Sequence, residues 1–180
     1  MATVRNDPSG ATELLERVRA GSTDALGELY RIHAEMVYGL AYRTTGSREE
    51  AEEVLQDVFV GLSRALRNYR EQGRFESWLK RLVVRTALMR MRSVRRKREV
   101  PLEARIEEPE TSVAHVRPLD RIMVQRALER LPDSLRVVFV LKEIEGFSHA
   151  DIARMLGISS GNSATRLSRA WALLRKEARP

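Results

Sequence analysis

The sequence contains no cysteine, few aromatic residues and no long hydrophobic run. The lack of cysteine excludes disulfides, thiolate nucleophiles and cysteine-based zinc sites. The histidines (His33, His115 and His149) are too far apart for a helical metal-binding pair, so no metal or cofactor is expected. No apolar segment approaches the roughly 18–20 residues of a membrane-spanning helix, and the N-terminus lacks the apolar core of a signal peptide. We therefore expect a reduced, cytoplasmic protein without a membrane partner.

Charge is plentiful in the 180 residues. Lys and Arg number 32 against 25 Asp and Glu, which gives a net charge of +7 and an isoelectric point near 10.3. Hydrophobic residues make up 43% and aromatic residues 6%, a balance typical of a soluble globular protein with an aliphatic core. The positive excess favours a polyanionic partner without identifying it.

Proline placement divides the chain. None occurs between Pro8 and Pro101, and Pro101, Pro109 and Pro118 then fall close together. We interpret the glutamate-rich stretch that contains the first two of these as a linker. The chain then comprises an N-terminal segment, a helical domain, the linker and a second helical domain, at residues 1–22, 23–98, 99–117 and 118–180. No two-residue alternation predicts a strand, so the expected fold class is all-α, with two small helical domains.

Apolar residues recur at the helical period through both domains. Ser47 and Glu50 form a capping box, in which a hydroxyl serves an orphan amide at the start of a helix. Glycine and proline mark several of the helix ends. Helices are expected near residues 13–20, 23–46, 47–66, 75–98, 119–130, 132–145, 148–156 and 160–178.

Residues 147–171 have the layout of a helix-turn-helix. Ser148 can cap a short helix, Ala153 stands where two helices approach, and Gly157 permits a left-handed turn between them. With about 100° per residue, the last helix places polar and cationic side chains opposite its apolar side. These are Asn162, Thr165, Arg166 and Arg169. Such a face suits the base edges and phosphates of duplex DNA, and the alternative is a helical hairpin with a solvated basic face.

A basic stretch in the helix expected at residues 75–98 contains no acidic residue. It comprises Lys80, Arg81, Arg85, Arg90, Arg92, Arg95, Arg96, Lys97 and Arg98. Tyr69, Phe75 and Trp78 lie just before it, and rings beside cations suit the unpaired bases and backbone of single-stranded nucleic acid. The alternative is that Phe75 and Trp78 are core residues and the charges form a solvated face. Spacing alone leaves both interpretations open.

An acidic face occupies the first half of the helix that Ser47 begins. It consists of Glu49, Glu50, Glu52, Glu53 and Asp57. Negative charge near a helix N-terminus stabilises the helix, which is one explanation, and a docking surface for a basic partner protein is the other. No Ser–His pair or metal-ligand set accompanies the carboxylates, so an enzyme is not expected.

In this order, the three features resemble a bacterial RNA polymerase sigma factor of the extracytoplasmic-function (ECF) group. The resemblance covers residues 25–176 and is carried by EEAEEVLQDVFVGL (49–62), FESWLKRLV (75–83) and LERLPDSLRVVFVLKEIEGFSHADIARMLGIS (128–159). It implies two helical domains, sigma-2 and sigma-4, joined by a flexible linker. It also implies a detachable specificity subunit for transcription initiation, which performs no chemistry itself.

The resemblance further implies partners and site residues. Core RNA polymerase would be bound through its β′ clamp helices and its β flap, and an anti-sigma protein holds many members inactive. Polymerase docking would use Glu53, Gln56, Asp57 and Phe59. The −10 element of promoter DNA would be captured as a melted single strand, through the loop 68–74 and the positions Tyr69, Phe75, Trp78, Lys80, Arg81 and Arg85. The −35 element would be read as duplex by Asn162, Thr165, Arg166 and Arg169.

The sequence departs from the family pattern at several of these places. Arg85 stands where Asn is frequent, and Met89 where Asp is frequent. Ser163 replaces a usually aliphatic residue, and Ala164 stands where Lys is common. The main rival interpretation is a free-standing helix-turn-helix regulator, which would dimerise on symmetric half-sites. A weaker one is an anti-terminator or RNA-binding adaptor that uses only the basic stretch.

Overall fold

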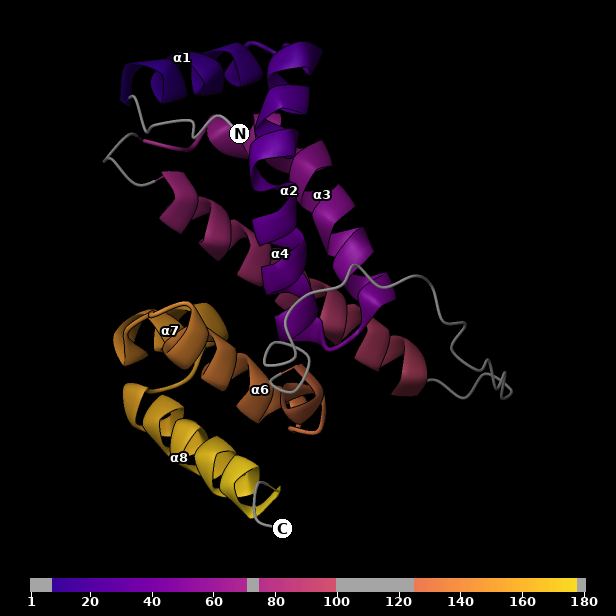
Figure 1. Cartoon of the computed structure of the whole chain (residues 1–180), viewed down its shortest axis with the longest axis vertical. Helices are drawn as coiled ribbons and strands as arrows, with labels where there is room; N and C mark the ends of the chain where they lie inside the picture. The colour runs from indigo at the N-terminus through magenta and orange to yellow at the C-terminus, as the bar shows by residue number, and fades with distance from the viewer. Residues whose placement is uncertain (1–7, 71–74, 100–124, 178–180) are drawn as a thin grey trace. The chain divides into compact units, whose positions relative to one another are not determined.

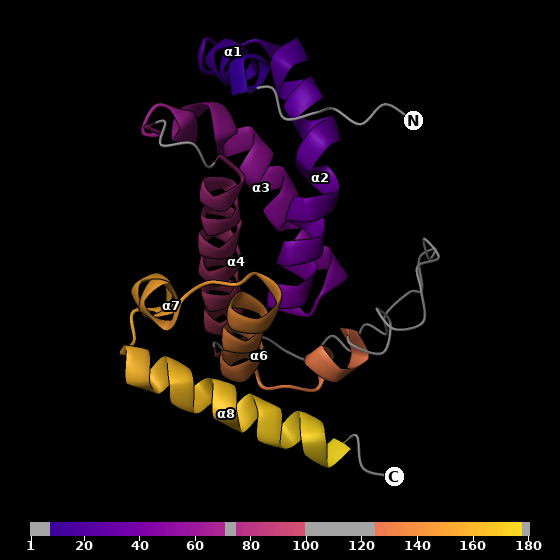
Figure 2. The ribbon, with the colours of Figure 1, turned by 60° about the vertical axis from the view of Figure 1, so that its left-hand side comes forward.

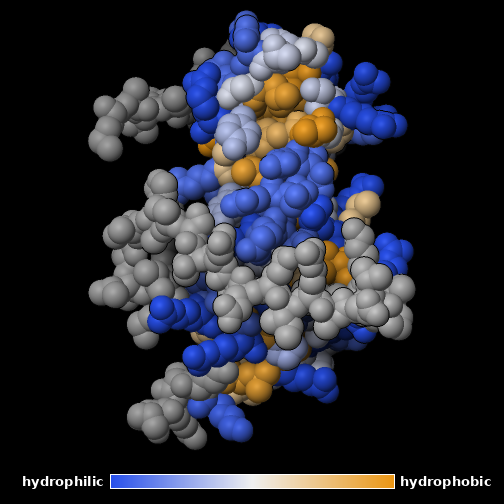
Figure 3. Space-filling model, turned by 90° about the vertical axis from the view of Figure 1, so that its right-hand side faces the viewer, coloured by the Kyte–Doolittle hydropathy of each residue, from blue (hydrophilic) through white to orange (hydrophobic). Residues whose placement is uncertain are grey.

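The structure is a computed structural model that describes residues 8–70, 75–99 and 125–177 (Figure 1). Every regular element in these ranges is helical, which confirms the all-α prediction. None of the helices in these ranges is long and apolar enough to cross a membrane. On the face seen in Figure 3, hydrophilic side chains cover much of the described surface and the apolar side chains form separate patches.

The chain divides into two compact units. One contains residues 1–42 and 47–87, and the other contains residues 43–46 and 88–180. The predicted boundaries after residues 22, 98 and 117 remain predictions. Apart from Glu99, the predicted linker at 99–117 lies outside the described residues.

The first unit is built from α1 (Pro8–Arg19), most of α2 (Thr23–Thr45), all of α3 (Arg48–Leu66) and the first half of α4 (Phe75–Glu99). Figures 1 and 2 show α2 and α3 side by side with the first half of α4. Helix α1 packs against α3. The core is aliphatic, as its composition predicted, and its fully buried side chains include Val18, Val37, Leu40, Val54, Leu62, Leu66, Leu79 and Val83.

The predicted helix starts are largely confirmed. The hydroxyl of Ser22 accepts the Ala25 amide at 3.3 Å, and the hydroxyl of Ser47 accepts the Glu50 amide at the same distance. The first helix begins at Pro8 rather than after Thr12, because proline is well suited to a first helical turn, where its missing N–H has no partner to lose.

The second unit contains helical residues 125–129, α6 (Asp133–Phe139), α7 (His149–Leu156) and α8 (Ser160–Glu177). Figure 2 shows α8 running beneath α6 and α7. A single helix was predicted at 132–145, but α6 widens into a π-helix at Val140–Ile144. The consecutive residues 137–141 are all buried, so this helix is covered on more than one side and shows no simple amphipathic face.

Candidate nucleic-acid interface

Four rings gather where α3 ends and α4 begins, and we call them the aromatic cluster. They are His33 of α2, Tyr69, and Phe75 and Trp78 of α4. The ring centroids are 5.1 Å apart for Tyr69–Trp78, 5.9 Å for Tyr69–Phe75, 5.7 Å for Phe75–Trp78 and 5.4 Å for His33–Phe75. These separations fall in the range of favourable aromatic contacts. The structure thus brings together the three rings that the sequence singled out and adds a fourth.

The rings differ in exposure, and the difference separates their roles. Tyr69 is only 8% exposed, whereas Phe75 and Trp78 are half-buried and retain accessible surface. Tyr69 therefore supports the cluster from within, and Phe75 and Trp78 are the rings that a base can reach. Residues 71–74 of the predicted recognition loop lie outside the described residues.

His33 was not among the predicted site residues. Burial lowers the pKa of its imidazole, and the negative charge of Glu76 acts in the opposite direction. The ring is therefore kept neutral near pH 7 and packs edge-on against Phe75 as an apolar group would. Its contact joins positions 42 residues apart in the sequence (75 − 33), which local spacing does not reveal.

Two of the three predicted cations of early α4 are exposed. Arg81 and Arg85 lie one turn apart on the helix surface. Lys80 is half-buried, and its Nζ atom lies 3.1 Å from a carboxylate oxygen of Glu76. Lys80 is thus held close to the aromatic cluster with part of its charge compensated, while Arg81 and Arg85 present theirs to solvent.

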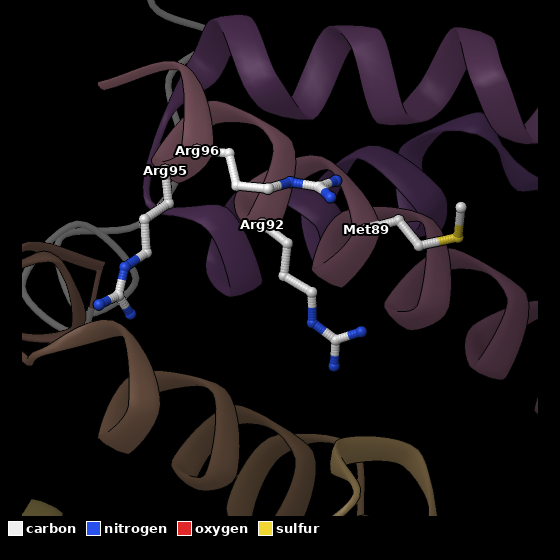
Figure 4. Close-up of a pocket in the computed structure, with 4 residues that line it drawn as sticks. All are labelled: Met89, Arg92, Arg95 and Arg96. Carbon is white, nitrogen blue, oxygen red and sulfur yellow. The ribbon is translucent and has the colours of Figure 1, made fainter. Parts of the chain in front are cut away.

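The basic stretch continues along α4 beyond these residues. Met89, Arg92, Arg95 and Arg96 line an open hollow of about 560 Å³, and Figure 4 shows Arg95 and Arg96 on one turn of α4 and Arg92 on the neighbouring turn. A hollow lined by guanidinium groups has the charge to accept phosphate oxygens. No three His, Asp or Glu side chains within the described ranges stand close enough together to hold a metal ion.

The acidic face of α3 is exposed where docking was predicted. Glu53, Gln56 and Asp57 share one exposed face, and Val60, which is 85% exposed, extends that face by one turn. The Ser47 hydroxyl lowers the pKa of the nearby Glu49 carboxyl by hydrogen bonding to it, so this end of the face keeps its negative charge.

Phe59, the fourth predicted docking residue, does not lie on that surface. It is 6% exposed, and its ring centroid lies 4.8 Å from that of Tyr30 on α2. Tyr30 is 43% exposed and covers it. Phe59 therefore packs α3 against α2, and the more exposed ring of this pair is Tyr30, which was not among the predicted site residues.

The helix-turn-helix has the predicted local geometry. The Ser148 hydroxyl accepts the Asp151 amide at 3.1 Å and begins α7. Gly157 has a φ of +68°, the left-handed conformation that glycine adopts at little cost, and it ends α7. The Ser159 hydroxyl accepts the Asn162 amide at 3.1 Å and begins α8.

Helix α8 has the two faces that its sequence predicted. Ser163 and Ala170 are fully buried, whereas Asn162, Thr165 and Arg169 are exposed and Arg166 is half-buried. The Thr165 hydroxyl donates to the Gly161 carbonyl oxygen at 3.0 Å, which leaves its oxygen as an acceptor. One face of α8 thus presents an amide, a hydroxyl and two guanidinium groups, the groups that contact base edges and phosphates in a major groove.

Two family models match the chain. Residues 29–97 match Sigma-70 region 2, and residues 121–174 match Sigma-70, region 4. The ECF RNA polymerase sigma factor SigM of Mycobacterium tuberculosis is 36% identical over 176 residues, which cover 94% of this chain and 85% of the relative. The ECF RNA polymerase sigma factor SigW of Bacillus subtilis is 28% identical over 179 residues, which cover 92% and 95%.

Two solved structures are also similar to this chain. CnrH in complex with the cytosolic domain of CnrY is 26% identical to this chain, with a TM-score of 0.55 and coverage of 91% of this chain and 93% of that one. The sigma factor RpoE in complex with the anti-sigma factor NepR, from Bartonella quintana, has a TM-score of 0.66 at 20% identity and covers 86% and 98%, which supports the fold alone.

The two family matches span more than half of the chain, in the order expected of the resemblance. The predicted family and the prediction that the protein is not an enzyme are therefore confirmed. The chain belongs to the extracytoplasmic-function family of RNA polymerase sigma factors, which direct transcription initiation.

Proposed function

We propose that this sigma factor docks on the β′ clamp helices of core RNA polymerase through the exposed face of α3. The observation that carries this proposal is the exposure of Glu53, Gln56 and Asp57 on one helix face of a protein whose net charge is +7. A carboxylate face repels DNA, so it suits a basic protein surface instead. Phe59 fixes the helix from beneath, and Tyr30 and Val60 add apolar surface at its edge.

In this proposal the aromatic cluster captures the melted −10 strand. Phe75 and Trp78 offer ring surface for an unstacked base, and Tyr69 holds both rings from behind. Arg81 and Arg85 bind the backbone phosphates of the same strand, and Lys80 lies within reach of it. Because extruding a base costs a few kcal/mol of stacking, the rings have to be in place before the strand arrives.

The second unit reads the −35 element as duplex. Helix α8 enters the major groove with Asn162 and Thr165 toward base edges and with Arg166 and Arg169 toward bases or phosphates. We propose that another surface of this unit binds the β flap of the polymerase.

An anti-sigma protein is the further partner that we propose. CnrH and RpoE, to which this chain is similar, were each solved with a second protein bound, in the latter case an anti-sigma factor. A partner with a basic face would cover the acidic face of α3 and so compete with polymerase. Release of that partner would then determine when this sigma factor becomes active.

Transcription in vitro tests the proposal. The full chain would be added to bacterial core RNA polymerase and a promoter library randomised at the −35 and −10 positions. We expect transcripts only when both proteins are present, from templates that share two motifs at a fixed spacing. Binding of a symmetric operator as a stable dimer, with no effect on polymerase, would instead establish the free-standing regulator.

A further inference from the structure

The end of α1 is tied to the turn that follows α3 by Arg19. The Nε atom of Arg19 donates to the Leu66 carbonyl oxygen at 2.9 Å, and Nη2 donates to the Tyr69 carbonyl oxygen at 2.5 Å. The third nitrogen, Nη1, pairs with the carboxylate of Glu16 on α1 itself. Arg19 thus reaches across 47 and 50 residues of sequence to two backbone groups that lie within one turn of each other.

The chemistry of this contact suits a guanidinium group. The last carbonyl groups of a helix lack partners within the helix and carry its negative dipole end, so a cation there is favourable. The Leu66 carbonyl already accepts the Tyr69 amide at 3.0 Å, which closes a tight turn. The planar, forked donor set of arginine can hold Leu66 and Tyr69 at once, which a lysine ammonium group does less well.

Arg19 is also held firmly on its own helix. Leu14, Leu15 and Val18 of α1 are buried, and α1 packs against α3. The carboxylate of Glu16 fixes the far side of the guanidinium group. The tie therefore joins the packed helix α1 to the last residue of α3 and to Tyr69, which lies three residues beyond it.

We propose that Arg19 is a positioning residue for capture of the −10 strand. By fixing the backbone of Tyr69, it fixes the buried ring against which Phe75 and Trp78 pack. Helix α1 then belongs to the −10 site, although it precedes residues 29–97, which match Sigma-70 region 2. This inference rests on the proposed function of the aromatic cluster.

The test compares full-length variants bound to core RNA polymerase. Arg19→Ala removes the tie, and Arg19→Lys keeps the charge but loses the fork. Arg17→Ala is the matched control, because Arg17 is an exposed arginine of the same helix and its loss changes the net charge equally. Each complex would be titrated with a fluorescent single-stranded −10 oligonucleotide and, separately, with a −35 duplex, and its affinity for core polymerase would be measured.

We expect Arg19→Ala to weaken capture of the single strand about tenfold, the scale set by losing charge-assisted hydrogen bonds. Arg19→Lys should fall between Arg19→Ala and the wild type. Affinity for the −35 duplex and for polymerase should stay within about twofold of wild type in all variants, because α8 belongs to the other unit and Glu53, Gln56 and Asp57 of α3 lie more than two turns before Leu66. Arg17→Ala should match the wild type throughout.

Equal single-strand affinities for Arg19→Ala and Arg17→Ala would overturn the inference. So would a parallel loss of single-strand, polymerase and duplex binding, because that would make Arg19 a general stabiliser of the fold. If Arg19→Ala does not fold, a folded Arg19→Lys protein that captures the single strand as well as the wild type does would also overturn the inference. Failure of the wild-type complex to capture the oligonucleotide would instead remove the proposed −10 function on which the inference rests.

Discussion

The Nδ1 atom of His149 lies 2.9 Å from the hydroxyl oxygen of Ser163, and this contact joins the first turn of α7 to a fully buried position on α8. A hydroxyl buried without a partner would cost about 1–3 kcal/mol, and the imidazole removes that cost. An imidazole and a hydroxyl thus form a polar pair between α7 and α8. Together with apolar packing, this hydrogen bond holds α8 against α7.

Ser163→Ala is expected to destabilise the second unit by about 1–2 kcal/mol, since it leaves a small void and an unpaired imidazole nitrogen. A double-mutant cycle with His149→Phe isolates the hydrogen bond, and we expect a coupling of about 0.5–1.5 kcal/mol in the free energy of unfolding. Ser168→Ala, at an exposed position of the same helix, is the control. A coupling near zero would show that the two side chains only lie close together.

Local patterns were sufficient to predict the helix caps and the turn of the helix-turn-helix. Ser47, Ser148 and Gly157 act on amides or dihedral angles a few residues away, so their roles are contained in short stretches of sequence. The two faces of α8 follow from the same kind of periodicity. The site could be located from the sequence to this extent.

Contacts between helices could not be predicted in this way. His33 reaches Phe75 only because packing brings α2 against the start of α4, and Arg19 reaches Leu66 and Tyr69 only because packing brings α1 against the end of α3. Phe59 illustrates the same limit, since its helix position does not reveal that Tyr30 covers it. The partners of Arg19 outside α1 are backbone carbonyl groups, and no pattern of side chains in the sequence indicates such a contact. Arg19 was therefore not predicted as a site residue.

The pH dependence of stability is expected to reveal the burial of His33. Burial lowers the pKa of His33 in the folded protein below its ordinary value of 6.5, with Glu76 opposing the shift. Below pH 6.5 the unfolded chain therefore takes up a proton that the folded protein resists, and the free energy of unfolding falls as the pH falls toward the lowered pKa. Above that range the effect is absent.

Chemical unfolding of the wild type and of His33→Gln, followed from pH 8 to pH 5, tests this expectation. The difference in the free energy of unfolding between the two proteins should be constant above pH 7 and should shift against the wild type as the solution becomes more acidic. A difference independent of pH would show that His33 takes up its proton as readily in the folded protein as in the unfolded chain.

Reversal of charge at Asp57 is expected to abolish polymerase docking without unfolding the protein. Asp57→Arg places a cation on an exposed face that we propose contacts basic clamp helices, so we expect at least a tenfold loss of affinity for core polymerase, on the scale known for interface charges. Glu13→Arg makes the same charge change at an exposed position of α1. Unfolding midpoints of both variants should stay near that of the wild type.

A pull-down with core polymerase measures the result. Equal recovery of polymerase by Asp57→Arg and Glu13→Arg would place the docking surface elsewhere. If both variants lost polymerase binding, the cause would be the change in net charge, because the loss would not depend on which position was substituted.

If one unit binds the melted strand and the other binds duplex DNA, a substitution in either unit should weaken binding of only one of the two DNA probes. Arg166→Ala should weaken binding of the −35 duplex by about 1–3 kcal/mol, the value of a good base contact, and leave capture of the −10 single strand unchanged. Arg81→Ala should do the reverse and should also lower the salt dependence of single-strand binding by somewhat less than one unit of log affinity per log salt, as loss of one phosphate contact requires. Each variant is the other's control, because both remove one arginine charge from an accessible helix face. Equal losses with both probes would mean that the α4 and α8 faces act on one continuous DNA surface, and the assignment of melted strand to one unit and duplex to the other would then fail.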